Sequence, residues 1–333
     1  MRRLFRSEAG AVLLWVVASV VLGAVVVPWL YQGGRQFSAM VAADGEEGVI
    51  GWLGAACGRA QFGRFYNRSL LLCALLLVPA LLRRIGYLRR EREAAGVVLP
   101  IRPSWPLAQR WLLWAVGAVL AGGLVWLLGI VMEWMGAFSG TGTSLQLKQL
   151  LAKAVLPAAV VSILEEAMFR GLLLGLWLRV ARPISACVGS SLVFAAMHFL
   201  SPPPGYVIAD PTSVMAGFEL LGATLLHYTD PRFFVADFLT LVGVGLVLAG
   251  ARVRTGSLWL PMGLHFGWVM AFKMFHLTHV RLPDGPVDSL LVGDSLRSGL
   301  LPLAMLGLTA ACCHLLLCCS RGPACARDVM ENE

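Results

Sequence analysis

Residues 160–177 read VVSILEEAMFRGLLLGLW, an apolar run that is interrupted by the carboxylates of Glu165 and Glu166 and by Arg170. A charged side chain at the centre of a bilayer costs about 2.5 kcal/mol or more, so such residues usually mark a functional site. A structural ion pair that only joins helices is the alternative. Because one arginine neutralises one carboxylate, the second carboxylate favours a functional role.

The composition is typical of a polytopic membrane protein. Hydrophobic residues make up 58% of the 333 residues and charged residues 14%, whereas soluble domains carry about 25% charged residues. The net charge of +8 does not indicate nucleic-acid binding, because the basic residues flank apolar runs instead of forming one tract. We therefore predict an all-α fold, a polytopic transmembrane helical bundle with the lipid bilayer as its solvent.

About eight apolar runs are long enough to be interpreted as membrane spans. The first follows a basic start and no small-residue cleavage site comes after it, so we predict an uncleaved helix and not a signal peptide. No strand pattern is visible, and a short amphipathic helix is predicted near 212–227. The predicted spans are 9–30, 65–82, 111–134, 147–180, 184–200, 234–251, 258–275 and 300–319.

Basic residues predict the orientation of these spans. An even number of spans puts both termini on one side, and that side carries more lysine and arginine, including seven arginines in the connector at 83–110. The positive-inside rule then predicts both termini in the cytoplasm. We predict an integral, multi-pass protein of a bacterial cytoplasmic membrane.

The spacing of the charged residues predicts different roles for them. Glu166 and Arg170 are four residues apart and can pair along one helix face. Glu165 is rotated by about 100°, so this pairing leaves its carboxylate available as a general base. Gly171 and Gly175 form a small-xxx-small pair, which predicts a close approach of another helix at this point.

Two histidines are candidates for the same site. His198 ends the run Phe194–His198, and His265 lies between Gly263 and Gly267. A lone histidine in a membrane helix usually forms a helix–helix hydrogen bond. Together with a glutamate, however, one histidine can activate a water and a second can donate to a developing oxyanion. The same three side chains are also suited to a divalent metal such as zinc, and both alternatives stay open.

Three motifs in this order carry a resemblance to a known family. They are Glu-Glu-x-x-x-Arg at 165–170, Phe-x-x-x-His at 194–198, and a later histidine, His265, that is preceded by Thr-Gly-Ser-Leu-Trp at 255–259. This set, over about residues 148–275, resembles the CAAX-protease and bacteriocin-processing family of intramembrane endopeptidases, and the number of spans resembles the type II CAAX prenyl endopeptidases.

The resemblance implies a role for each motif residue. Glu165 would be the catalytic base, His198 would help to activate water, and His265 would stabilise the oxyanion. Glu166 and Arg170 would be supporting residues. If the enzyme depends on a metal, Glu165, His198 and His265 would be its ligands. The chain would then comprise an N-terminal hairpin and connector (1–110), a protease core (111–320) and a short cytoplasmic tail (321–333).

One departure from the family pattern keeps a second function open. The family usually has Asn four residues after the last histidine, where this chain has Val269. The predicted function is hydrolysis of a peptide bond in a membrane protein or lipid-anchored peptide, with a glutamate-activated or metal-bound water. The alternative is a non-proteolytic membrane scaffold or transporter that uses the buried Glu/Arg cluster.

Overall fold

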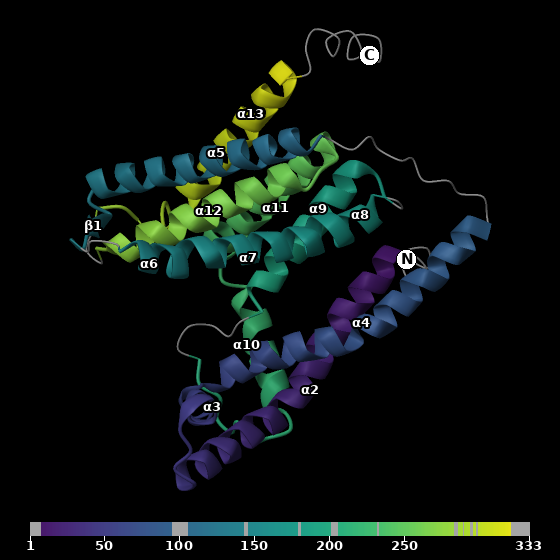
Figure 1. The fold of residues 1–333 in the computed structure, drawn as a ribbon, viewed down its shortest axis with the longest axis vertical. Helices are drawn as coiled ribbons and strands as arrows, with labels where there is room; N and C mark the ends of the chain where they lie inside the picture. Colours follow the sequence, from purple (N-terminus) through teal and green to yellow (C-terminus); the bar gives the residue numbers. More distant parts are fainter. Residues whose placement is uncertain are drawn as a thin grey trace. The chain divides into compact units, whose positions relative to one another are not determined.

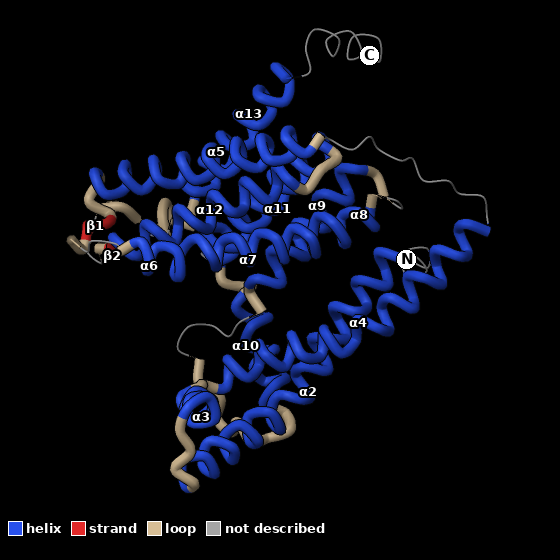
Figure 2. The backbone as a smooth tube through the Cα atoms, viewed as in Figure 1, coloured by secondary structure: helices blue, strands red, loops and turns tan. Residues whose placement is uncertain are grey.

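The computed structural model describes residues 8–94, 106–142, 146–178, 181–200, 206–231, 233–282, 286–288, 290–293, 296–297 and 299–320. The predicted tail at 321–333 and part of the predicted connector, residues 95–105, lie outside these ranges. Within them the chain is almost entirely helical (Figures 1 and 2). The predicted all-α, polytopic helical bundle is confirmed.

The helices follow the predicted apolar runs. The N-terminal ones are α2 (Glu8–Ala43), α3 (Gly48–Arg59), α4 (Phe62–Ala94) and α5 (Leu107–Trp134). One continuous helix is built from α6 (Leu147–Leu150), η1 (Leu151–Val155), α7 (Leu156–Glu165), η2 (Glu166–Leu173) and α8 (Leu174–Trp177). The remaining ones are α9 (Pro183–His198), α10 (Ala216–His227), η3 (Phe233–Phe238), α11 (Leu239–Thr255), α12 (Trp259–Thr278) and α13 (Leu300–Ser320).

Six helices of the described ranges are long and apolar enough to cross a membrane, where the sequence predicts about eight spans. The other two predicted spans, 184–200 and 258–275, form α9 and α12. α9 has 16 residues and a length of about 24 Å, which is shorter than a hydrocarbon core of about 30 Å. α12 has 20 residues but carries His265, Lys273 and His276, which lower its hydropathy.

A short antiparallel strand pair follows α5 and α12. β1 (Phe138–Gly140) pairs with β2 (His279–Arg281), so that Phe138 lies opposite Arg281 and Gly140 opposite His279. The sequence shows no strand pattern here, because three residues are too few to show alternation.

Two compact units make up the fold, and residues 1–100 and 196–230 form the first. Within it α2 packs along α4, α3 packs on α2, and α10 contacts α2. The contact of α10 requires Gly217, because a Cβ atom there would collide with the carbonyl oxygen of Ala24. α10 is the helix predicted near 212–227, although the sequence predicts this segment as part of the 111–320 core.

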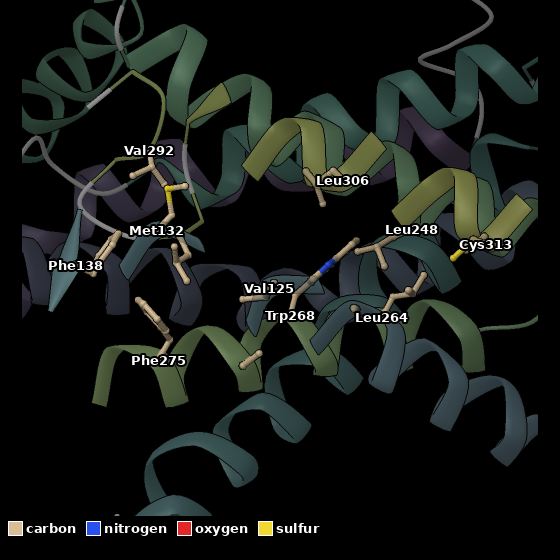
Figure 3. Packing of buried hydrophobic residues seen from close by; sticks show 14 of the residues in the cluster. Val125, Met132, Phe138, Leu248, Leu264, Trp268, Phe275, Val292, Leu306 and Cys313 are labelled. Carbon is tan, nitrogen blue, oxygen red and sulfur yellow. The ribbon is translucent and has the colours of Figure 1, made fainter. Parts of the chain in front are cut away.

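Residues 101–195 and 231–333 form the second unit, which has the larger core. α12 is its central helix and packs against α5, α7 and α11, while α13 packs against α11 and α5. Figure 3 shows Val125, Leu264 and Trp268 among the side chains that fill this core. The unit contains both the charged stretch and the predicted histidine of α12.

Glycines bring α5 and α12 into close contact. A Cβ atom at Gly263 would collide with the carbonyl oxygen of Trp114, and one at Gly267 would collide with that of Ala118. The predicted close approach at Gly171 and Gly175 was wrong: a Cβ atom at Gly171 would meet only ordinary contacts, and no other part of the described chain lies within 4 Å of one at Gly175. The close approach therefore lies on the helix that carries His265.

We expect Gly263→Ala to lower the free energy of unfolding by about 1–3 kcal/mol, because the backbones of α5 and α12 must move apart to admit the methyl group. Gly175→Ala is the matched control and should change this free energy by no more than about 0.5 kcal/mol. Unfolding in mixed detergent micelles measures both values. Equal losses in the two variants would contradict the proposed contact.

Candidate active site

The charged motif lies where the helix changes its geometry. η2 is a π-helical segment that begins at Glu166 and continues through Arg170 to Leu173. A π-helix bonds residue i to residue i+5, so each turn holds more residues and the side chains after it are rotated. π-helical turns occur frequently at functional sites. The sequence predicts one long helix here, but its periodicity does not reveal the π segment.

The predicted ion pair within this helix is confirmed. Nη1 of Arg170 donates to Oε1 of Glu166 over 2.8 Å, and the two side chains are only 2% and 0% exposed. A buried ion pair persists because each charge compensates the other after both have lost water. The pair therefore forms a fixed electrostatic anchor on the helix.

His265 of α12 joins this pair. Its Nδ1 lies 2.8 Å from Oε1 of Glu166, the oxygen that also accepts from Arg170. An ionised carboxylate only accepts hydrogen bonds, so Nδ1 carries a proton and donates it. A carboxylate that accepts from one ring nitrogen fixes the orientation of the imidazole and leaves the other nitrogen for chemistry. Sequence reasoning paired Glu166 with Arg170 and missed this bond.

The second nitrogen of His265 faces Glu165. Nε2 lies 3.8 Å from Oε2 of Glu165, whose side chain is 26% exposed, whereas that of His265 is 6% exposed. The imidazole thus lies between the two adjacent carboxylates and contacts Glu166 more closely. Glu165 is the more accessible carboxylate of the two, which suits a group that must reach water and substrate.

Phe194 of α9 covers the guanidinium. The ring centre of Phe194 lies 4.3 Å from Cζ of Arg170, within the range of a cation–π contact. The same ring meets those of Phe169 and His265 edge to face, with centroids 5.0 and 6.3 Å apart. The phenylalanine of the Phe-x-x-x-His motif was part of the predicted pattern, but the sequence assigned no contact to it.

Two further sequence predictions concern His198 and Val269. His198 is the last residue of α9, is exposed, and belongs to the first unit, so its predicted action with Glu165 stays a prediction. Val269 packs in an apolar cluster with Ala118 and Phe266. Its side chain therefore takes part in helix packing at the position where the family usually has an amide.

Two of the three predicted metal ligands, Glu165 and His265, lie together within the second unit. Nδ1 of His265 already bonds Glu166. The potential metal ligands that lie close together are therefore Nε2 of His265 and the carboxylate of Glu165. Across the described ranges no group of three His, Cys, Asp or Glu side chains could hold a metal ion. The third predicted ligand, His198, belongs to the first unit, so a metal site that includes it stays a prediction. The mechanism below is derived from the side chains alone.

The segment that carries these contacts matches a known family. Residues 147–271 match a family model described as Rce1-like type II CAAX prenyl endopeptidase. The resemblance seen in the sequence is confirmed over this segment. No curated protein and no solved structure matches the chain.

The Rce1-like segment runs from α6 into α12 and includes every predicted site residue, from Glu165 to His265. A CAAX prenyl endopeptidase is a protease, so the match indicates a hydrolase. Together with the six apolar helices it also indicates an integral membrane protein.

Proposed function

We propose that the chain is an intramembrane endopeptidase that hydrolyses a peptide bond of a membrane-associated or lipid-anchored protein. The observation that carries this proposal is the bridge from Glu166 through His265 to Glu165 within the Rce1-like segment. This bridge supplies a carboxylate for water and an oriented imidazole beside it, which are two of the groups that peptide hydrolysis needs.

Glu165 acts as the general base in this proposal. Its carboxylate takes a proton from water as the water oxygen attacks the carbonyl carbon of the peptide bond. The protonated Glu165 then gives that proton to the leaving nitrogen as the carbon–nitrogen bond breaks. His198 would orient the attacking water, the role that the family resemblance implies for it.

His265 stabilises the oxyanion in this proposal. Because Nδ1 donates to Glu166, Nε2 can donate to an oxyanion only if the imidazole carries both protons. Two carboxylates, Arg170 and this imidazolium together have no net charge. When Glu165 takes a proton from water, the net charge of the four groups rises from zero to +1. This positive charge balances the negative charge of the oxyanion. Such a fixed charge is most effective where water is excluded.

The substrate is expected to be a prenylated peptide, since the matched family is described by that activity. Val269 provides no amide donor to the oxyanion, so Nε2 of His265 carries more of this task in the proposed mechanism. We also propose that both termini lie in the cytoplasm, on the side where a prenylated protein tail is accessible.

The test is a cleavage assay with the full chain in lipid nanodiscs and a fluorogenic peptide that ends in a farnesylated CAAX sequence. We expect one cleavage product, and we expect the rate to stay within about twofold after incubation with a strong zinc chelator. A rate that falls to zero and returns with added zinc would contradict the glutamate-activated water. Absence of cleavage for farnesylated, geranylgeranylated and unmodified peptides alike would favour a non-proteolytic scaffold or transporter.

A further inference from the structure

Arg170 has fewer hydrogen-bond partners than its charge requires. A guanidinium has five N–H donors, and a buried one is costly unless these donors are compensated. Nη1 of Arg170 donates to Glu166, whereas Nη2 is buried and has no hydrogen-bond partner in the described part of the chain. Arg170 itself is 2% exposed, so bulk water does not compensate the remaining charge.

The aromatic face of Phe194 lies against this buried guanidinium. Its ring is 1% exposed and its centre lies 4.3 Å from the guanidinium carbon, closer than that of Phe169 at 6.0 Å. A desolvated cation over a ring face is stabilised by the ring quadrupole, enough to change an equilibrium by about 30-fold. An aliphatic side chain of similar volume would fill the space without supplying this attraction.

We infer that Phe194 is a positioning residue, which acts on His265 through Arg170 and Glu166. The ring holds the guanidinium, the guanidinium holds Oε1 of Glu166, and that oxygen holds Nδ1 of His265. If the guanidinium moves, the carboxylate loses the partner that keeps it aligned. Nδ1 then loses its acceptor, and Nε2 is no longer directed toward Glu165.

This inference goes beyond the proposed function in assigning a task to the aromatic residue of the second motif, and its kinetic test rests on that function. A purely structural phenylalanine would fill volume, so its replacement would act through packing. A positioning residue acts through the electron density of its ring. Fluorinated phenylalanines separate the two, because fluorine withdraws density from the ring face at nearly constant shape.

The experiment introduces phenylalanine with one, two and three fluorines at position 194 of the full chain in nanodiscs. We expect kcat for the farnesylated peptide to fall stepwise to about one tenth or less, with KM unchanged. The same series at Phe266, which packs against Trp114 with ring centroids 5.0 Å apart, is the matched control and should leave kcat unchanged. A flat kcat across the series at position 194, or equal losses at both positions, would overturn the inference.

A second measurement does not depend on catalysis. The ¹⁵N resonances of His265, assigned with a His265→Gln variant, report the proton and hydrogen bond at Nδ1. We expect them to shift with each fluorine at position 194 and to stay fixed with fluorine at position 266; unchanged resonances in both series would overturn the inference. Glu165→Gln is assayed in parallel, and full turnover by that variant would refute the proposed function while the resonances still decide the role of Phe194.

Discussion

Replacement of Glu166 by alanine is expected to lower the free energy of unfolding by about 3–5 kcal/mol, the cost of leaving one member of a buried ion pair without its partner. Arg170 is almost fully buried against Glu166, so the variant leaves a desolvated positive charge. His265 would lose its acceptor as well. Reversible unfolding in mixed micelles measures the loss.

Two further variants test whether the loss of stability is specific to the broken ion pair. Glu165→Gln changes the adjacent, more exposed carboxylate and should alter stability by less than about 1 kcal/mol. The double replacement Glu166→Leu with Arg170→Met removes both charges and should recover most of the stability, because a buried ion pair contributes little beyond well-packed apolar groups. A loss in Glu166→Ala no larger than that in Glu165→Gln would contradict the anchoring role of Glu166.

The double variant also separates stability from function. It should fold, yet His265 would have no carboxylate to orient its Nδ1, so cleavage should stay low. The buried pair thus serves the orientation of a third residue more than the stability of the bundle, in agreement with the weak stabilisation that buried ion pairs generally provide.

The sequence predicts the pair of Glu166 and Arg170 because both lie on one helix and their spacing fixes their separation. It does not predict the bond from Glu166 to His265, which lie 99 positions apart and on different helices. Such a contact depends on how α12 packs, and no local pattern encodes that. The family motifs brought the two residues to the same site without indicating which carboxylate the imidazole bonds.

The glycine pairs also show that spacing within one helix does not predict which neighbouring helix it contacts. Gly171 with Gly175 and Gly263 with Gly267 have the same spacing, but a close approach was predicted only at the first pair. Only the second pair faces a neighbouring backbone, that of α5. The spacing of two glycines predicts a flat helix face. Whether another helix packs against that face depends on whether it is turned toward the core. For α9 the sequence predicts the helix, but not that its Phe194 contacts Arg170.

In the proposed mechanism Glu165 activates the water that cleaves a lipid-anchored peptide. Glu165→Gln keeps the size of the side chain and removes the base, so it is expected to lower kcat by about 10²–10⁴-fold, the usual contribution of a general base. Glu133→Gln, which changes a half-exposed carboxylate at the end of α5, is the matched control and should keep the wild-type rate.

The decisive measurement is the rate of cleavage of a farnesylated CAAX peptide by wild-type, Glu165→Gln and Glu133→Gln protein in nanodiscs, at equal folded concentration. The proposed mechanism predicts cleavage by the wild-type and Glu133→Gln proteins and a rate near background for Glu165→Gln. Cleavage by Glu165→Gln at the wild-type rate would contradict it.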